Sequence, residues 1–478
     1  MYLCHLIYRK MQAIHTDTII ALATPAGIGA IAIIRLSGPE AIALVNAHFK
    51  PKFATKDLMQ VPSHTLHLGN IFDDKHIIDE VLVAVFKNPN SYTGEDLIEI
   101  NCHGSLYIQQ KIIELFIKKG ARQAEGGEFT LRAFLNGKID LSQAEAVADL
   151  IAAKSDAAHQ IAIQQMRGGF SKDLSLLRQQ LLDFASLIEL ELDFSEEDVE
   201  FANRKQLKDL IHKLITNIKV LLDSFTMGNV FKNGIPVALI GAPNVGKSTL
   251  LNALLNEEKA IVSEIPGTTR DAIEDEISIN GVVFRFIDTA GIRDTQDFVE
   301  NIGIQKTFEN IDKAQLVLYI MDGQDLKENQ SLAPIQKRIV QLQSDYPDKK
   351  ILPILNKTDL LTKDRLTNVQ SDIPELISLS ARDKTGLDKL TKILAGLVAT
   401  GSLSNNQTIV SNARHYEALR KAFTSLTEVQ AGLENELPSD LLAIDIRDSL
   451  RHLGSITGDF DVDRDLLGNI FANFCVGK

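Results

Sequence analysis

The sequence predicts a multidomain chain: an N-terminal α+β domain, a helical domain, and an α/β domain with a phosphate-binding loop that is inserted into the helical domain. Three observations predict this class. A glycine-rich loop at 241–248 follows an apolar run, helical spacing flanks that region on both sides, and short β-rich runs fill residues 16–133. We therefore expect domains at 1–133, 134–232, 233–398 and 399–478, the second and the last forming one helical domain.

The N-terminal segment combines short β-rich runs with one helical pattern. Helical spacing covers Ile108 to Ile117, and the β-rich runs cover 18–23, 30–34, 80–86 and 96–100. Several short strands around one helix are typical of a separate α+β domain.

Helical spacing dominates the regions before and after the α/β domain. Ser142 and Glu145 form an S-x-x-E capping box, which predicts the start of a helix. A long apolar pattern follows between residues 174 and 192. Near the C-terminus, one helix face is formed by Leu442, Ile446, Leu450 and Leu453. Because a lone C-terminal pair of helices would bury little apolar surface, the two regions are expected to join.

The loop Gly241–Ser248 reads G-x-x-x-x-G-K-S and directly follows the apolar run 237–240. A strand, a glycine turn and a helix start place backbone N–H groups around a phosphate at the positive end of a helix dipole. Lys247 is expected to reach the β- and γ-phosphates, and the Ser248 hydroxyl is expected to complete a Mg²⁺ shell.

Two further segments follow at positions suited to the γ-phosphate. In Gly267-Thr268-Thr269, a threonine can bring its hydroxyl to Mg²⁺ and its backbone N–H to the γ-phosphate; we assign Mg²⁺ to Thr269. The run 282–287 predicts a strand that ends in Asp288-Thr-Ala-Gly291. There Asp288 would orient the metal waters. Asn280-Gly281 before this strand predicts a hairpin with the preceding run.

The segment Asn356-Lys357-Thr358-Asp359 follows the apolar run 351–355. A carboxylate such as that of Asp359 can accept both the N1–H and the exocyclic amine of guanine. Adenine lacks this donor pair, so the segment indicates GTP over ATP. Ser380-Ala381-Arg382 can support the base edge with backbone groups. These elements, in this order, predict a guanine-nucleotide-binding α/β domain.

The predicted nucleotide contacts come from all of these segments. They are Asn244, Val245, Gly246, Lys247, Ser248, Thr249, Ser263, Glu264, Ile265, Pro266, Gly267, Thr268, Thr269, Asp288, Thr289, Ala290, Gly291, Asn356, Lys357, Asp359, Ser380, Ala381 and Arg382.

The residues that would assist hydrolysis are less conventional. Ile292 occupies the position where Ras-like enzymes place the glutamine that orients the attacking water. An asparagine carbonyl at Asn244 can help to hold a monovalent cation, and Glu300 can polarise water. On spacing alone, a solvated carboxylate at a helix start is the favoured interpretation of Glu300.

Composition limits the partners and the compartment. A net charge of −13 opposes diffuse binding to nucleic acid, so an RNA contact requires a local basic patch or a second protein. No apolar run is long enough to span a bilayer. Cys4, Cys102 and Cys475 have neither disulfide nor zinc spacing, which predicts a reducing cytoplasm. The first residues are mildly apolar and basic, with no signal-peptide cleavage site, and the true start is Met1 or Met11.

In the order of its parts, the chain resembles the MnmE (TrmE) family of tRNA-modification GTPases across residues 16–478. The likeness depends on several motifs besides those of the nucleotide site. They are Thr24–Gly27 with Arg35–Gly38, Ser91–Asp96 with Glu99, His103-Gly104, Gly127–Lys138, and the terminal Phe474-Cys475-Val476-Gly477-Lys478.

The resemblance implies an N-terminal domain similar to folate-binding one-carbon modules, a helical domain and an inserted Ras-like P-loop GTPase domain. It also implies a homodimer formed through the N-terminal domains and a bound 5-formyltetrahydrofolate or related folate. The positions that match the family's folate contacts are Arg35, Glu99, Lys138 and Lys478. Without the resemblance, a structural ion pair is the favoured interpretation of Arg35 and Glu99.

The resemblance also implies how hydrolysis is assisted. K⁺ is held by Asn244 with oxygens at Ser263, Ile265 and Thr268, and Glu300 positions the water. Further matches to residues of catalytic interest are Arg293, linked to turnover and loop ordering, and Cys475, which either assists the modification or packs as a thiol.

The function implied is that of a K⁺-dependent GTP hydrolase. With an FAD-dependent MnmG-like partner, in a heterotetramer, it would add a carboxymethylaminomethyl-type group to C5 of the wobble uridine of certain tRNAs. The alternative is a GTP-switched RNA or ribosome assembly factor, although such factors carry basic RNA-binding appendages. A dynamin-like membrane GTPase is disfavoured by the lack of an amphipathic basic helix.

Overall fold

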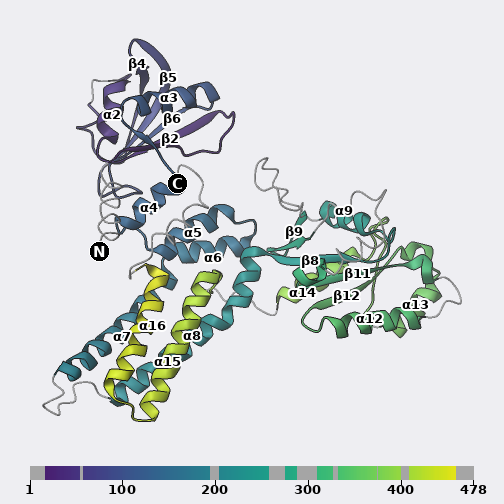
Figure 1. The fold of residues 1–478 in the computed structure, drawn as a ribbon. Coiled ribbons are helices and arrows are strands. Elements are labelled where there is room, and N and C mark those ends of the chain that lie inside the picture. The colour runs from purple at the N-terminus through teal and green to yellow at the C-terminus, as the bar shows by residue number, and fades with distance from the viewer. Residues whose placement is uncertain are drawn as a thin grey trace. The chain divides into compact units, whose positions relative to one another are not determined.

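The computed structural model describes residues 17–53, 57–193, 204–257, 275–287, 309–326, 332–373, 375–399 and 409–458. By its internal contacts, the chain divides into two compact units. Figure 1 labels the helices and strands along the chain. The first unit combines 1–148 with 165–202 and 439–478, and the second combines 149–164 with 203–438.

A seven-stranded sheet forms the body of the first unit, in the order β3-β4-β5-β6-β2-β1-β7. Its strands are β1 (Ile19–Leu22), β2 (Ile31–Ser37), β3 (Phe49–Pro51), β4 (Thr65–Asp73), β5 (His76–Phe86), β6 (Leu97–His103) and β7 (Arg122–Gln123). The helices of this region are α2 (Ala41–His48), α3 (Leu106–Lys118) and α4 (Glu128–Leu135). The predicted strands and the predicted helix, α3, are therefore confirmed, and the structure adds β3, β4, β7, α2 and α4 to them.

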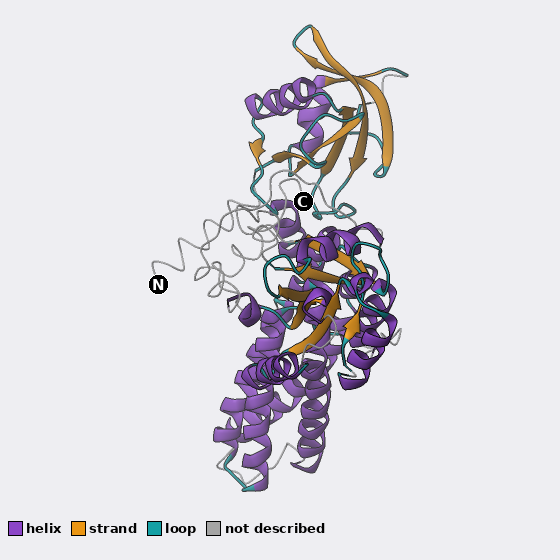
Figure 2. Cartoon of the chain, turned by 90° about the vertical axis from the view of Figure 1, so that its right-hand side faces the viewer, coloured by secondary structure: helices purple, strands orange, loops and turns teal. Residues whose placement is uncertain are grey.

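One face of this sheet forms a core with α2 and α3. Successive strand residues point to opposite faces, so Ala32, Ile34 and Leu36 of β2 share one side. They pack in one buried cluster with Val45 of α2 and Phe116 of α3. Figure 2 shows both helices together on this side of the strands.

The other face of the sheet carries the charged pair Arg35 and Glu99. The register places Arg35 of β2 opposite Glu99 of β6. Because side chains alternate along each strand, the same face holds Ile31, Leu66 and Leu82. These three side chains are 68%, 61% and 36% exposed. Three large apolar side chains therefore lie open on the face that presents the Arg35–Glu99 pair.

Three further helices belong to the first unit: α5 (Leu141–Ala152), whose last four residues belong to the second unit, α7 (Gly169–Asp193) and α16 (Ser439–Thr457). Helix α16 packs along α7, and its predicted apolar face is confirmed because Leu442, Ile446, Leu450 and Leu453 are all buried.

The capping box of α5 lies two residues earlier than predicted. The carboxylate of Asp140 accepts from the N–H of Gln143 at 2.9 Å, and the Gln143 side chain accepts from the N–H of Asp140 at 3.0 Å. Ser142 instead hydrogen bonds to Asp140 and to Ser171. The reciprocal pair is therefore Asp140 and Gln143, and the prediction of Ser142 and Glu145 was wrong.

Three helices of the second unit lie outside its sheet region: α6 (Asp156–Met166), whose last two residues belong to the first unit, α8 (Arg204–Asn233) and α15 (Ala413–Glu434). Helices α8 and α15 pack side by side, with the rings of Phe225 and Tyr416 stacked at 4.3 Å. Ala157 and Ile161 of α6 belong to the same apolar core as Phe284 of the second sheet.

The second sheet has six strands in the order β13-β12-β11-β8-β10-β9. They are β8 (Ile235–Ile240), β9 (Asp275–Ile279), β10 (Val282–Phe286), β11 (Leu316–Asp322), β12 (Lys350–Asn356) and β13 (Ile377–Ser378). All pairs are parallel except β9 with β10. Asn280 and Gly281 join this pair with φ of 49° and 79°. Positive φ at both central residues is typical of a two-residue hairpin turn, so the predicted hairpin is confirmed.

Helices cover both faces of the second sheet. Leu239 and Leu318 share a core with α9 (Lys247–Glu257) and α14 (Leu387–Ala399). On the opposite face, neighbouring strand positions pack against α12 (Ala333–Asp345) and α13 (Lys363–Asp372). In such doubly wound sheets ligands bind beyond the carboxyl ends of the strands, and the predicted loops follow β8 and β12 at that edge.

In the part of the chain that the structure describes, none of the helices has the length and apolarity needed to cross a bilayer.

Candidate functional site

The glycine-rich loop joins β8 to α9, as predicted. Gly241 and Gly246 have φ of 153° and 94°, a region that disfavours side chains. A β-carbon at Gly241 would collide with the carbonyl of Ile320, and one at Gly246 would collide with the side-chain amide of Asn356. The loop therefore requires glycine at both positions in order to lie close to the neighbouring strand ends.

Lys247, Ser248 and Thr249 form the first turn of α9. The ammonium of Lys247 donates to the carbonyls of Gly241 and Ala242 at 2.9 and 3.0 Å, so the cation lies within the loop. Burial lowers the pKa of Lys247. A cation surrounded by a helix N-terminus and backbone amides suits a polyphosphate, and the hydroxyl of Ser248 suits Mg²⁺.

Asn356 connects three segments of the site. It ends β12 and is 2% exposed. Its side-chain amide donates to the carbonyl of Val245 at 2.8 Å, and its side-chain oxygen accepts from the N–H of Ala381 at 3.0 Å. The base-reading segment, the phosphate loop and residues 380–382 are therefore brought together, as the sequence predicts.

Asp359 is exposed and oriented at the edge of the same site. Its carboxylate accepts from the hydroxyl of Ser380 at 2.7 Å, and that hydroxyl also accepts from the N–H of Asp383 at 3.2 Å. A carboxylate held in this way can accept two parallel hydrogen bonds from a planar base, which is the geometry that guanine offers. Arg382 lies exposed beside these residues in sequence.

Lys357 has a partner that sequence reasoning missed. Its ammonium donates to the carbonyl of Asn244 at 2.8 Å and to the carboxylate of Asp322 at 2.6 Å. Asp322 ends β11, just as Asn356 ends β12. The sequence does carry a signal for Asp322, because it directly follows an apolar run, as do Asn356 and the phosphate loop.

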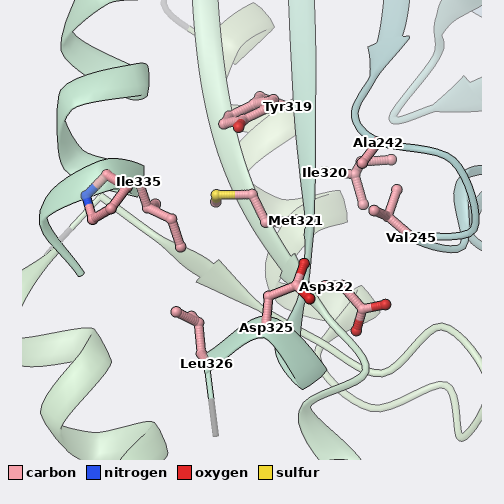
Figure 3. A pocket seen from close by; sticks show the side chains of 10 residues that line it. Ala242, Val245, Tyr319, Ile320, Met321, Asp322, Asp325, Leu326 and Ile335 are labelled. Carbon is pink, nitrogen blue, oxygen red and sulfur yellow. The ribbon is translucent and has the colours of Figure 1, made fainter. Parts of the chain in front are cut away.

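Asp322 also lines a cleft of about 430 Å³ beside the phosphate loop (Figure 3). Ala242 and Val245 of the loop border this cleft, and Met321 and Leu326 give it an apolar lining. Asp325 lines it near Asp322.

The remaining predicted residues of the nucleotide site lie outside the described residues. They are Ser263, Glu264, Ile265, Pro266, Gly267, Thr268, Thr269, Asp288, Thr289, Ala290, Gly291, Arg293 and Glu300, and the same holds for Cys475 and Lys478 near the C-terminus.

In the first unit, Arg35 and Glu99 form a direct ion pair. A guanidinium nitrogen of Arg35 lies 2.7 Å from a carboxylate oxygen of Glu99, and the two side chains are 17% and 23% exposed. The guanidinium also lies over the rings of Tyr92 and Phe129, 5.5 and 5.6 Å from their centres. A mostly buried cation and anion therefore lie side by side, with the cation over two aromatic rings.

Lys138 lies against the loop that carries Tyr92. Its ammonium donates to the carbonyl of Pro89 at 2.9 Å, and its side chain runs beside Gly94. Lys138 and the Arg35–Glu99 pair therefore border the same loop from different elements.

A buried charge network missed by sequence reasoning supports this loop. Arg132 of α4 is fully buried and donates to the carboxylates of Asp17, Glu95 and Glu128 at 2.6, 3.1 and 3.1 Å. Glu95 in turn accepts from the hydroxyl of Ser37 at 2.8 Å. Residues that precede β1, follow β5 and lie on α4 are therefore joined through one guanidinium.

The mostly parallel sheet, the glycine loop at the end of β8 and the predicted guanine-reading segment at the end of β12 show that the second unit contains a P-loop GTPase domain. Comparison with known proteins defines the family of the whole chain. The family description "MnmE helical domain" matches residues 141–475, and "GTP-binding protein TrmE N-terminus" matches residues 18–138. The chain belongs to the MnmE family.

Several curated relatives match over nearly their full length. The tRNA modification GTPase MnmE of Christiangramia forsetii is 59% identical over 472 residues, which cover 97% of this chain and 99% of the relative. The tRNA modification GTPase MnmE of Flavobacterium johnsoniae is 58% identical over 469 residues, which cover 97% and 100%. Among solved structures, the FeoB G domain of Methanococcus jannaschii is 28% identical, covers 34% of this chain and 98% of that chain, and has a TM-score of 0.23.

Membership implies that GTP is the substrate and that Mg²⁺ accompanies it. The described residues fit both, because the cradle of the phosphate loop, the ammonium of Lys247 and the hydroxyl of Ser248 lie together at the start of α9.

Proposed function

We propose that this protein is a K⁺-dependent GTP hydrolase of tRNA modification. With an FAD-dependent MnmG-like partner, it adds a carboxymethylaminomethyl-type group to C5 of the wobble uridine of certain tRNAs. The observation that carries the proposal is the guanine-reading geometry of Asn356 and Asp359 in a chain that matches tRNA modification GTPases over nearly their whole length.

In the proposed hydrolysis, the chain binds and orients the triphosphate. Backbone N–H groups of the loop and the ammonium of Lys247 hold the phosphates, and Ser248 with Thr269 holds Mg²⁺, which offsets the charge that develops on the leaving phosphate. Glu300 orients the attacking water, which Ile292, at the usual glutamine position, is unable to do. Arg293 assists turnover.

Asn244 is the proposed K⁺ ligand within the described residues. It is exposed, has a φ of 61°, and its backbone carbonyl is fixed by Lys357. An oxygen ligand on a fixed backbone suits a cation that must sit beside the triphosphate, and an alkali ion there would replace an arginine finger. Ser263, Ile265 and Thr268 complete this proposed site.

The folate site is proposed around Arg35 and Glu99. A guanidinium can bind a carboxylate of the folate glutamate tail, and a carboxylate can accept from the pterin N–H and amine. The pairing of these two side chains, their partial exposure and the nearby rings of Tyr92 and Phe129 support the proposal. Lys138 and Lys478 complete the set, and Cys475 is proposed to assist the modification.

The organisation is proposed as a homodimer through the N-terminal domains. The open face with Ile31, Leu66 and Leu82 supports this, because exposed apolar side chains on one face favour association. The proposed domains are 1–133, 134–232, 233–398 and 399–478. A net charge of −13 opposes binding of this chain to tRNA. In the proposed cytoplasmic heterotetramer, the MnmG-like protein would therefore supply much of the surface that contacts the tRNA.

Two measurements test the proposal. GTP hydrolysis is expected to be much faster in K⁺ than in Na⁺ at equal ionic strength, and equal rates would refute the cation assignment. Mass spectrometry of tRNA from a strain that lacks the protein is expected to show wobble uridines without the C5 substituent. Intact modification in that strain would refute the role in tRNA.

A further inference from the structure

We infer that Asp322 is a positioning residue of the nucleotide site. It holds Lys357 against the phosphate loop and so couples the reading of the base to the conformation at Asn244. The inference deepens the proposed function, and its first test does not depend on K⁺.

The backbone fixes Asp322 next to the guanine-reading segment. In the register of β11 and β12, Asp322 lies opposite Asn356. Gly323 follows so closely that a β-carbon there would lie 2.8 Å from the carbonyl oxygen of Lys357. The carboxylate therefore leaves the end of β11 directly beside the turn on which Lys357 sits.

Both oxygens of the Asp322 carboxylate are engaged. One accepts from the N–H of Gln324 at 2.9 Å, and the other accepts from the ammonium of Lys357 at 2.6 Å. The Asp322 side chain is 13% exposed. Solvent therefore screens this pair weakly, because salt acts less on partly buried charges. An anion held by its own backbone in this way is pre-organised to fix a lysine.

Lys357 transmits this position to the phosphate loop. Its ammonium also donates to the carbonyl of Asn244, while the adjacent Asn356 donates to the carbonyl of Val245. Two successive loop carbonyls are therefore held by two successive residues of the base-reading segment.

The backbone at the two ends of this contact is strained. Lys357 and Asn244 have φ of 59° and 61°. Both values lie in the left-handed region that side chains disfavour, so the surroundings must hold both residues in place. We assign part of that restraint to the chain of contacts from Asp322 through Lys357 to Asn244.

The test uses Asp322→Asn in the full-length protein. Asparagine keeps the shape and the hydrogen bond from Gln324 but removes the charge that holds Lys357. Asp325→Asn is the matched control, because it removes the same charge from the same cleft and leaves the Asp322–Lys357 pair intact. Equal thermal unfolding of the variants and the wild type checks that the fold is kept.

The first readout is the dissociation rate of a fluorescent GDP analogue. We expect Asp322→Asn to raise this rate about tenfold, the usual effect of losing one charged hydrogen bond, and Asp325→Asn to leave it unchanged. In a Lys357→Met background, Asp322→Asn should add nothing further. Equal rates for the two aspartate variants, or an additive effect in the double variant, would overturn the inference.

The second readout is the K⁺ concentration that gives half-maximal GTP hydrolysis. We expect Asp322→Asn to raise this concentration. Lys357 would then be held less firmly, so Asn244, the proposed K⁺ ligand, would lose a well-positioned donor to its backbone carbonyl. Faster GDP release with an unchanged K⁺ requirement would overturn the coupling to Asn244. A wild type that ignores K⁺ would instead overturn the proposed cation, and GDP release alone would then decide the role of Asp322.

Discussion

Arg35 and Glu99 lie directly opposite each other on β2 and β6, with guanidinium and carboxylate 2.7 Å apart. Cross-strand pairs of opposite charge often contribute only to sheet stability. This pair differs from an ordinary surface pair because both side chains are mostly buried and the guanidinium contacts the rings of Tyr92 and Phe129. A mostly buried ion pair whose cation lies over two aromatic rings is well suited to a ligand that carries its own hydrogen-bond donors and carboxylates.

The first prediction concerns this pair. Glu99→Gln should weaken binding of 5-formyltetrahydrofolate at least about tenfold, because it would remove the charge-assisted hydrogen bond that we propose between Glu99 and the pterin. Isothermal titration with the full-length protein measures the change. Glu80→Gln is the matched control, since Glu80 pairs with Lys52 at 2.8 Å on the same sheet, where both side chains are nearly half exposed. Equal folate affinity in the two variants would contradict the proposed site.

The second prediction concerns Asn356. Its side chain bridges the buried carbonyl of Val245 and the N–H of Ala381. Asn356→Ala should weaken GDP binding by roughly 2–4 kcal/mol, because it leaves both backbone groups without this partner. Equilibrium titration with a fluorescent GDP analogue measures the effect. Thr358→Ala, two residues further along, is the control. A variant that binds GDP as tightly as the wild type would show that the bridge does not organise the site.

Features encoded by local pattern were predictable from the sequence. The hairpin at Asn280-Gly281, the buried face of α16 and the loop after β8 each depend on a few adjacent residues, and the structure confirms them. The start of α5 was not predictable in detail, because D-x-x-Q at 140–143 and S-x-x-E at 142–145 overlap and both satisfy the capping pattern. Only the hydrogen bonds distinguish them.

Contacts between distant segments were not predictable. Asp17, Glu95 and Arg132 come from three parts of the chain, and each resembles a solvated surface charge when only its neighbours are considered. Arg132 and its carboxylate partners are brought together only when α4 and the loop after β5 pack near the start of β1. Asp322 was missed for a related reason, since its partner Lys357 is supplied by the next strand of the sheet.

The third prediction concerns Arg132. Arg132→Met should lower the free energy of unfolding of the N-terminal domain by about 3–5 kcal/mol, because it leaves buried carboxylates without their shared cation. Local hydrogen exchange in α4 and β1 of the full-length protein measures the loss. Arg122→Met is the matched control: it contacts Asp17 and Glu128 from a side chain that is 41% exposed, so its cost should be smaller. Equal protection in both variants would contradict the role of Arg132 as the centre of the network.

The fourth prediction is a loss of stability of this region in acid. Burial raises the pKa values of Asp17 and Glu128, but hydrogen bonds and charges from Arg122 and Arg132 outweigh burial and hold both values below the ordinary 3.8 and 4.5. The folded state therefore binds fewer protons than the unfolded chain at these carboxylates. Their contribution is present above the ordinary values and is lost as the pH falls through the lowered ones.

Hydrogen exchange of α4, measured in the full-length protein from pH 6 down to about pH 3 and corrected for intrinsic exchange rates, tests this sign. We expect protection to be steady near neutrality and to decline once the pH falls below the ordinary carboxyl values. Glu128→Gln removes one of the two titrating groups and should therefore show lower protection near neutrality and a shallower decline. If the wild type and this variant declined in parallel, Glu128 would not be the group whose protonation weakens the network.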